Sequence, residues 1–171
     1  MPVTRLVAAT DAEALADVLS RNREAMAAIE PRRPSIYFTT KGQRAIIQDA
    51  LRRYSEGLAF PRVILDDDTV VGRINLSEIV QGPARRAELG YYLDAKAQGR
   101  GLATRAIDEI VTLAFGRLGL HRIQAATRLD NAASQRILER NDFARVGIAR
   151  DYLRVGGAWR DHVLYERIAA Q

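Results

Sequence analysis

The sequence contains no cysteine and only two histidines, His121 and His162. Without cysteine, a disulfide scaffold, a thiolate zinc site and a cysteine nucleophile are all excluded. Two histidines argue against a histidine-built metal centre, and we expect no bound metal. A chain of 171 residues needs neither disulfides nor metal to fold, because it can bury roughly 70% of the surface that its unfolded form exposes. We expect one domain over residues 1–171.

Long apolar runs are also lacking. No stretch approaches the roughly 20 apolar residues that a membrane-spanning helix needs, and residues 1–5 lead into an acidic segment instead of an apolar signal core. We therefore expect no membrane association and a cytoplasmic location.

Lysine is scarce, since Lys41 and Lys96 are the only two, but arginine brings Lys+Arg to 26 against 21 Asp+Glu, a net charge of +5. A basic balance suggests nucleic acid as a partner. A nucleic-acid footprint is usually a patch or stripe of basic residues, whereas here they are interleaved with acids and never exceed a pair in a row. We therefore expect no direct nucleic-acid binding. The 47% apolar and 27% charged residues are typical of a soluble globular protein.

Hydrophobic periodicity predicts the secondary structure. Strands are expected at residues 3–9, 60–65, 69–79, 87–93, 121–127, 144–155 and 159–168, and helices after a cap at Thr10 or Asp11 and at 41–55, 101–118 and 131–140. Asp66, Asp67 and Asp68 favour a solvated hairpin turn, since the other ligands of a calcium loop are missing. The order of elements predicts an α/β fold, a mixed sheet with helices on its faces.

The segment from Gln98 to Thr104 lies between a predicted strand and a long amphipathic helix. Two glycines allow a tight turn and a close approach to a ligand. The amides at the start of the helix form an anion site, and Arg100 and Arg105 add positive charge, so pyrophosphate is the natural ligand. The alternative is a turn that binds nothing. The segment is neither a P-loop nor a Gly-x-Gly-x-x-Gly fingerprint.

Three segments in order resemble the GNAT superfamily of acetyl-CoA-dependent N-acetyltransferases. Gln98-x-x-Gly101-x-Ala103 matches its Q/R-x-x-G-x-G/A signature, Asn131-Ala132-Ala133-Ser134 matches the N-x-x-S of the RimJ/RimL type, and the tail 151–164 is similar to ribosomal-protein alanine N-acetyltransferases. The resemblance runs from about residue 87 to residue 165. It implies a twisted, mostly antiparallel sheet of about seven strands with helices on both faces.

The resemblance also implies acetyl-CoA as co-substrate and a set of residues that hold it. The backbone amides of the glycine turn would bind the pyrophosphate, the Thr104 hydroxyl would assist, one strand end would pair with the pantetheine arm, and Asn131 would contact that arm. This set comprises Tyr91, Tyr92, Leu93, Gln98, Gly99, Arg100, Gly101, Leu102, Ala103, Thr104, Asn131 and Ser134. For Asn131 a plain helix N-cap is the alternative, and both roles are compatible.

Amine acetylation needs a base that accepts the proton of the amine. The family places a carboxylate on the strand before the pyrophosphate loop, and Glu88 is the candidate. Alternation along the strand predicts that Glu88, Gly90 and Tyr92 share one face and Leu89 and Tyr91 the other. The alternative is that Glu88 only pairs with Arg85 or Arg86, or lines a solvated face.

The departing thiolate needs a proton or a dipole. The tyrosine that many members of the family use for this is replaced by Leu138. Ser134 is the candidate hydrogen-bond donor to the thiolate, and Tyr152 is a second candidate, with packing as its alternative role. The family's glycine before Phe143 is replaced by Asp142, which tolerates a left-handed conformation.

Five further residues have open roles. A structural role is favoured for His162 and a packing role for Trp159. Glu30, Arg32 and Arg33 are candidates for shaping the acceptor entrance, with plain surface solvation as the alternative.

The leading hypothesis is acetyl transfer from acetyl-CoA to a primary amine, best the N-terminal α-amine of a protein such as a ribosomal protein, by direct attack in a ternary complex. The alternatives are acetylation of a small amine, such as an antibiotic or peptide-like toxin, and a coenzyme-binding module with weak or no catalysis. The acceptor and the choice between monomer and homodimer remain open.

Overall fold

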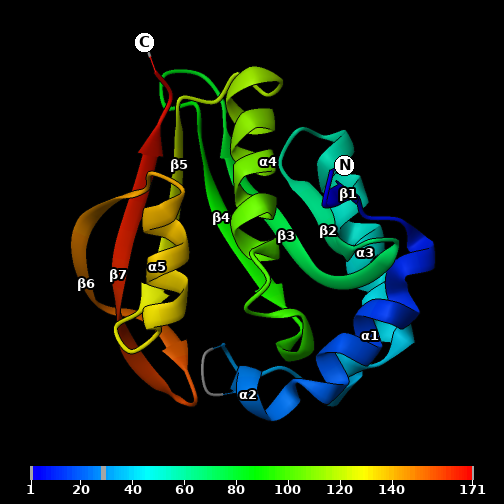
Figure 1. Ribbon diagram of the computed structural model, residues 1–171. Coiled ribbons are helices and arrows are strands. Elements are labelled where there is room, and N and C mark those ends of the chain that lie inside the picture. The colour runs from blue at the N-terminus through cyan, green and yellow to red at the C-terminus, as the bar shows by residue number, and fades with distance from the viewer. Residues whose placement is uncertain (1, 28–29, 171) are drawn as a thin grey trace.

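The computed structural model describes residues 2–27 and 30–170 (Figure 1). The strands are β1 (Thr4–Leu6), β2 (Phe60–Asp66), β3 (Thr69–Val80), β4 (Arg86–Leu93), β5 (Arg122–Arg128), β6 (Ala144–Val155) and β7 (Ala158–Ile168). The helices are α1 (Ala12–Arg21), α2 (Arg23–Ala27), α3 (Thr40–Ser55), α4 (Leu102–Gly116) and α5 (Ala132–Arg140), with short 3₁₀ turns η1 (Ala9–Asp11), η2 (Ser35–Phe38) and η3 (Ala95–Ala97).

The strands form one seven-stranded sheet in the order β1-β2-β3-β4-β5-β7-β6. β4 and β5 run parallel, and the other neighbouring pairs of described strands are antiparallel. A parallel pair needs a crossover connection, and α4 supplies it between β4 and β5 (Figure 1). The expected mixed, mostly antiparallel sheet is confirmed.

The two parallel strands separate soon after they meet. Their pairing covers only residues 86–88 of β4 and 122–124 of β5, while β4 continues to Leu93 and β5 to Arg128. Beyond Glu88, the edge of β4 that faces β5 therefore has no strand partner. We call this opening the splay.

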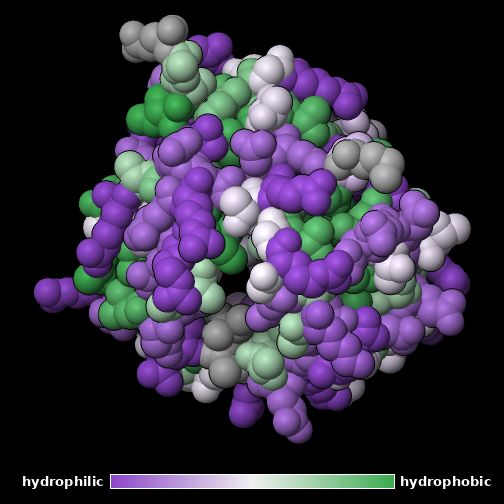
Figure 2. Space-filling view, in the orientation of Figure 1, coloured by the Kyte–Doolittle hydropathy of each residue, from purple (hydrophilic) through white to green (hydrophobic). Residues whose placement is uncertain are grey.

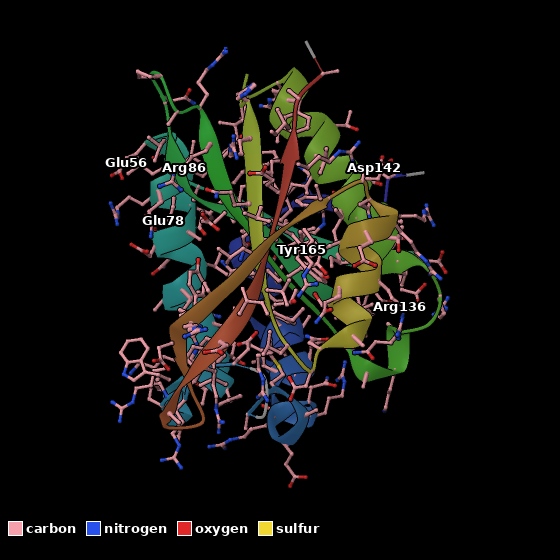
Figure 3. All side chains as sticks on the ribbon, turned by 90° about the vertical axis from the view of Figure 1, so that its left-hand side faces the viewer. Glu56, Glu78, Arg86, Arg136, Asp142 and Tyr165 are labelled. Atoms are coloured by element: carbon pink, nitrogen blue, oxygen red, sulfur yellow. The ribbon has the colours of Figure 1, made fainter. Side chains whose placement is uncertain are left out.

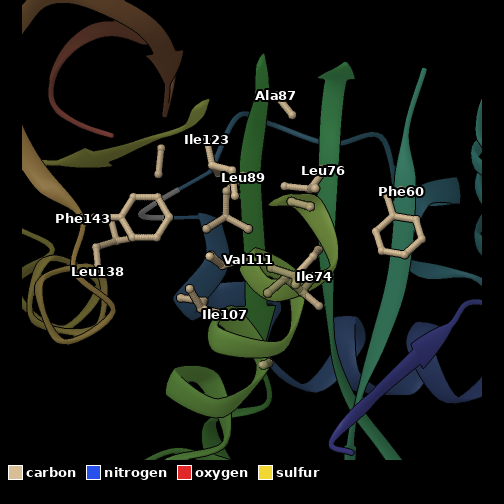
Figure 4. Packing of buried hydrophobic residues seen from close by; sticks show 14 of the residues in the cluster. Phe60, Ile74, Leu76, Ala87, Leu89, Ile107, Val111, Ile123, Leu138 and Phe143 are labelled. Atoms are coloured by element: carbon tan, nitrogen blue, oxygen red, sulfur yellow. The ribbon is translucent and has the colours of Figure 1, made fainter. Parts of the chain in front are cut away.

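Helices cover both faces of the sheet. In Figure 3, α3 lies on one side, with Glu78 and Arg86, and α4 and α5 lie on the other, with Asp142 and Tyr165. The larger buried cluster, between the sheet and α4 and α5, includes Phe60, Ile74, Leu89, Ile107 and Leu138 (Figure 4). A second cluster packs the opposite face against α1 and α3 through Leu15, Ile47 and Val63. Alternation along β2 explains both, since Phe60 and Ile64 belong to the first cluster and Val63 to the second.

The N-terminal region departs from the predicted pattern. β1 is shorter than the predicted strand at 3–9 because η1 begins at Ala9. Asp11 is the N-cap residue of α1, as predicted, but its carboxylate makes no capping hydrogen bond to that helix. It accepts hydrogen bonds from the Ala8 amide at 2.8 Å and from Arg5 instead. The short helix α2 was not predicted.

None of the helices in residues 2–27 and 30–170 is long and apolar enough to span a membrane. In the same residues there is no group of three or more histidines, aspartates and glutamates positioned to hold a metal ion.

Candidate active site

The glycine turn before α4 takes the conformation that its sequence requires. Gly99 and Gly101 have φ of 76° and 75°, a left-handed region that side chains disfavour. Gly101 is the N-cap of α4 and has no side chain to bond to the helix. The first amides of a helix have no acceptor within it, and those of Leu102, Ala103 and Thr104 find none elsewhere in the described chain. A Cβ at either glycine would meet nothing within 4 Å, so the turn is open to an anion.

Two side chains of the turn point back to the protein. Arg100 forms an ion pair through both guanidinium nitrogens with Asp66, at the turn between β2 and β3, with Nη2 to Oδ1 at 2.9 Å. The predicted hairpin turn is confirmed, with Asp66 opposite Thr69 and Asp67 and Asp68 exposed, although Asp66 itself is half-buried in the ion pair. The Arg100 side chain is 56% exposed, so the ion pair reduces its positive charge beside the turn without removing it. Gln98 Nε2 donates to the Leu93 carbonyl oxygen at 3.3 Å. What the turn offers to a ligand is mainly backbone amides.

The N-terminus of α5 lies on the same face of the sheet. Asn131 caps this helix, with its Oδ1 accepting from the Ser134 amide at 3.1 Å, which leaves its Nδ2 as a donor for a ligand. The Ser134 hydroxyl is 2.7 Å from the Tyr91 hydroxyl, so the pair joins α5 to β4. Burial raises the pKa of Tyr91 to about 12, with the hydrogen bond to Ser134 opposing. Tyr91 is therefore a neutral hydroxyl, able to donate to Ser134 while Ser134 donates onward.

The two departures from the family pattern are accommodated. Leu138 is fully buried in the core beside α4, so its position cannot supply a proton. Asp142 has φ of 58°, the left-handed conformation for which the family uses glycine, and it ends α5 as expected.

Glu88 lies on the opposite face of β4. Leu89 and Tyr91 pack with the cluster under α4, whereas Tyr92 packs with the cluster under α1 and α3, so the predicted division of faces is confirmed. The Glu88 carboxylate is 3.3 Å from Arg86 Nη1, which realises the predicted alternative pairing without settling its role. Burial raises the pKa of Glu88 above its ordinary value, with Arg86 opposing and Glu78 contributing. A raised pKa suits a carboxylate to accept a proton.

Tyr152 reaches the same face as Glu88 from β6. The register of β6 shifts between Ala149 and Leu153, Asp151 has φ of 47°, and a bulge of this kind redirects a side chain. Burial raises the pKa of Tyr152, and the negative charge of Glu88 contributes, so the two groups interact. Ser134 and Tyr152, the two candidate donors, thus lie on opposite faces of the sheet.

The β6–β7 hairpin places its two other conspicuous residues differently. His162 is 4% exposed, its Nδ1 lies 3.0 Å from the Arg160 carbonyl oxygen, and its ring lies 5.4 Å from that of Tyr152, as expected for a structural histidine. Trp159 is 60% exposed, so the expected packing role was wrong. Its position near the hairpin tip leaves little for it to pack against.

Residues of α2 and of the segment 30–38 line a cavity of about 220 Å³, among them Glu30, Arg32, Arg33, Tyr37 and Phe38. Arg33 stacks over the Tyr37 ring at 5.1 Å. Burial raises the pKa of Glu30, with Arg33 opposing. Glu30 is half-buried, whereas Arg32 and Arg33 are exposed, so the entrance role stays a prediction and the two arginines fit its alternative, surface solvation.

Sequence reasoning missed two polar residues of β3, Arg73 and Asn75. Arg73 is 9% exposed, and its Nε donates to Asn75 Oδ1 at 3.0 Å. Both side chains alternate with the buried Ile74 and Leu76, a pattern that normally indicates a solvent-facing strand side. The segments that pack over that side, α1 and α3 among them, bury Arg73, so no local signal would have found it.

The two sets of groups meet at the splay. The glycine turn, Asn131 and Ser134 lie on the face that α4 and α5 cover, and Glu88 and Tyr152 lie on the other. Figure 2 shows the surface hollowed between α5 and the chain that leads from β4 into α4. An anionic coenzyme can bind from one face, with its reactive end in the splay, while a nucleophile approaches from the other. This is the geometry of a two-substrate acyl transferase.

The family comparison agrees with this class. Residues 3–144 match the family model of the acetyltransferase (GNAT) domain. The chain belongs to this family and is an N-acetyltransferase that uses acetyl-CoA.

The individual relatives are more specific. The chain is 34% identical over 164 residues to the ribosomal protein uS5-alanine N-acetyltransferase of Escherichia coli, covering 95% of this chain and 84% of the relative. Its fold matches the crystal structure of the ribosomal-protein-S5-alanine acetyltransferase of Vibrio fischeri with a TM-score of 0.92 and 33% identity, over 96% and 91% of the two chains. It also matches Mycobacterium smegmatis RimJ in complex with CoA-disulfide, with a TM-score of 0.94 and 28% identity, over 97% and 81%.

Proposed function

We propose that this enzyme acetylates the N-terminal α-amine of a protein, with a ribosomal protein as the first candidate, by direct attack on acetyl-CoA in a ternary complex. The main support is the half-buried Glu88 carboxylate, which faces the side of the splay away from the coenzyme turn. The names of the relatives from Escherichia coli and Vibrio fischeri favour a ribosomal protein as acceptor. Such an acceptor would place the enzyme in the cytoplasm.

In the proposed reaction Glu88 accepts a proton from the acceptor ammonium group, directly or through one water. The neutral amine then attacks the thioester carbon, forming the C–N bond. As the tetrahedral intermediate collapses the C–S bond breaks, and the second proton that the nitrogen loses passes through water to the departing thiolate. Ser134, held by Tyr91, donates a hydrogen bond that stabilises the departing thiolate. A serine hydroxyl is a weak acid, so its role is hydrogen bonding and not full proton transfer. Tyr152, beside Glu88, lines the acceptor side and is the second candidate donor.

The coenzyme is held mainly by the main chain. The amides from Gly99 to Thr104 bind the pyrophosphate, assisted by the Thr104 hydroxyl and the helix dipole. The unpaired edge of β4 at Tyr91, Tyr92 and Leu93 pairs with the pantetheine amides, and Asn131 Nδ2 donates to one of their carbonyl groups.

A substrate panel tests this function. The purified protein is given acetyl-CoA and either hexapeptides with the N-terminal sequences of ribosomal proteins or small amines, and release of the coenzyme thiol is measured. We expect turnover of unblocked peptides and, by mass spectrometry, acetylation of the α-amine only. The matched control is the same peptide with a blocked N-terminus and a free lysine. Turnover of small amines alone would replace this function by small-molecule acetylation, and coenzyme binding without any turnover would indicate a non-catalytic module.

A further inference from the structure

Arg73 is a buried cation for which the described residues supply no matching anion. Its side chain is nine-tenths buried, with 9% exposed, and its one hydrogen bond in the described chain goes from Nε to the neutral Asn75 amide oxygen. No carboxylate among the described residues lies within ion-pair distance of it. Buried arginines are almost always paired, because an unpaired buried charge is costly. The two remaining nitrogens of the guanidinium group therefore indicate a ligand.

The surroundings of Arg73 hold further unused donors. Arg73 and Asn75 line a cavity of about 160 Å³ between α3 and strands β2 and β3. Directly across from Arg73 on β4 is Tyr92, whose buried hydroxyl has no hydrogen-bond partner in the described chain. The charged groups that face the cavity from α3 are already paired, Asp49 with Arg52 and Arg53 with Glu78. None of them neutralises Arg73.

The register of β3 and β4 places these donors relative to the candidate base. Ser77 lies opposite Glu88, Asn75 opposite Gly90, and Arg73 opposite Tyr92. A Cβ at Gly90 would meet nothing within 4 Å, so there is open space above the sheet at this residue. Gly90 lies just beyond Glu88, the last residue of β4 that pairs with β5. Along this face of the sheet the order is therefore base, open space and donors, with about 7 Å between successive same-face positions.

Arg73 and Asn75 offer a ligand hydrogen-bond donors and almost no acceptors, although Asp49 and Ser77 also line the cavity. A guanidinium group has no acceptor, and an amide has one oxygen and two N–H donors. The Asn75 oxygen is already used by Arg73, so its Nδ2 is what remains for a ligand. Such a subsite fits an oxygen with lone pairs and gives nothing to an alkyl chain.

We propose that Arg73 and Asn75 bind the carbonyl oxygen on the carbon next to the reactive amine, so that the enzyme selects α-amino acyl acceptors over simple alkylamines. With the amine in the open space at Gly90, Glu88 lies on one side of it and the donors of Asn75 and Arg73 on the other. Tyr92 contributes a hydroxyl at the far end of the subsite. This inference rests on the proposed function, since a protein N-terminus is an α-amino acyl compound.

The experiment compares two small acceptors that differ in one carbonyl group. Alaninamide and isopropylamine are each supplied with saturating acetyl-CoA, and their kcat/KM values are measured for the wild-type protein and its variants. The two amines differ in basicity, but that difference cancels when the ratio of the two values is compared between variants. We expect the ratio to favour alaninamide in the wild type.

Two variants remove the subsite in different ways. Asn75→Asp keeps an oxygen for Arg73 but replaces the donor by an acceptor and neutralises the cation. Arg73→Met keeps the volume and removes the charge. We expect each to lower kcat/KM for alaninamide at least about 10-fold, as loss of a charged or well-aligned hydrogen bond does, and to change that for isopropylamine less than about 2-fold. Coenzyme A affinity should not change.

Thermal stability separates binding from a structural role. Removing an unpaired buried charge relieves a cost, so Arg73→Met should keep or raise the Tm. The matched control is Arg62→Met on the adjacent strand β2, because Arg62 is satisfied by hydrogen bonds to Thr4 Oγ1 and O at 2.9 and 2.8 Å. It should lower the Tm and leave the alaninamide to isopropylamine ratio unchanged.

The outcomes are distinguishable from those of the peptide panel. Peptide turnover with an unchanged ratio in both subsite variants would overturn the inference and leave the proposed function standing. A ratio that collapses in both variants supports the inference even if no ribosomal peptide is acetylated. A wild-type ratio below one, a fall in Tm of Arg73→Met equal to that of Arg62→Met, or turnover of neither amine would overturn it.

Discussion

The two faces of the sheet prepare the splay for its two substrates in different ways. On the face that α4 and α5 cover, most of the groups are backbone amides, those that follow Gly99 and Gly101, together with the capping side chain of Asn131. Local geometry fixes the positions of all of them. On the α1 and α3 face they are side chains from distant segments, Arg73 from β3, Glu88 from β4 and Tyr152 from β6. The first arrangement binds a constant coenzyme, and the second can vary with the acceptor.

The charged and titratable groups of the two faces also differ. On the coenzyme face Arg100 is paired with Asp66, and Tyr91, whose pKa burial raises to about 12, is hydrogen-bonded to Ser134. On the acceptor face burial raises the pKa values of both Glu88 and Tyr152, and Arg73 has no counter-ion in the described chain. Perturbed groups of this kind gather where proton transfer and specific binding take place. Substitutions on the acceptor face should therefore change turnover, and those in the glycine turn should change coenzyme affinity.

The largest effect is expected for Glu88→Gln. Loss of the base should reduce kcat by about 100-fold or more, while calorimetry should give an unchanged Kd for coenzyme A because Glu88 faces away from the glycine turn. An equal loss of coenzyme affinity would show that the two faces are not separate. The pH dependence has a definite sign: below its pKa the Glu88 carboxyl is protonated and cannot accept a proton, so kcat falls as the pH falls. Since that pKa is raised, the decrease of kcat on acidification should begin above the ordinary glutamate pKa of about 4.3. The Glu88→Gln variant should not show this pH dependence.

Filling the open space at Gly90 is the next test. Gly90→Val introduces a side chain into open space in a strand, where valine is favoured, so the fold should be kept. We expect kcat/KM for the acceptor to fall about 10-fold or more, the effect of misplacing an acceptor by a fraction of its size, with coenzyme affinity unchanged. Gly147→Val is the matched control, because Gly147 is also in a strand with open space at its Cβ but lies on β6. Equal losses in the two variants would contradict the placement of the acceptor.

A coenzyme-side substitution should do the reverse. Gly101→Ala forces a side chain into a left-handed conformation, which costs about 1–2 kcal/mol, and the turn should relax away from its ligand-binding shape. We expect coenzyme A to bind about 10-fold more weakly while kcat at saturating coenzyme stays within about 2-fold. Gly119→Ala is the control, with φ of 64° and open space at its Cβ near the other end of α4. It should lower the Tm without changing coenzyme affinity.

The smallest effect is expected for Ser134→Ala. Removing a neutral hydrogen bond to the thiolate should lower kcat about 5- to 10-fold, and the Tyr91 hydroxyl would lose its partner at 2.7 Å. Tyr91→Phe separates the two roles, since it keeps the Ser134 hydroxyl while releasing it from β4, and its effect on kcat should be smaller. If Tyr152→Phe lowered kcat more than Ser134→Ala, the donor would instead be Tyr152, on the acceptor face.

How much could be predicted follows from how far apart the contributing residues are. The strands and the helices α3, α4 and α5 were predicted because their hydrophobic periods are local, and the capping role of Asn131 follows from one turn of chain. Two predictions that depended on competing partners were wrong. The Asp11 carboxylate does not bond to the amides of α1 because Arg5 and the Ala8 amide bind it, and Trp159 does not pack because it is exposed at the hairpin. In both cases the residue type was compatible with the predicted role. The presence of a tertiary neighbour at Asp11 and its absence at Trp159 produced a different result.

The sequence by itself determined the glycine turn, the order of strands and helices and the face on which Glu88 lies, because backbone conformation and strand alternation are set within a few residues. The tertiary structure alone decided that β4 parts from β5 after Glu88, that the register of β6 shifts at Tyr152, and that Arg73 is buried with no counter-ion among the described residues. These features depend on which segments pack against each other, and burial and pairing are properties of the neighbours a side chain meets and not of the side chain itself.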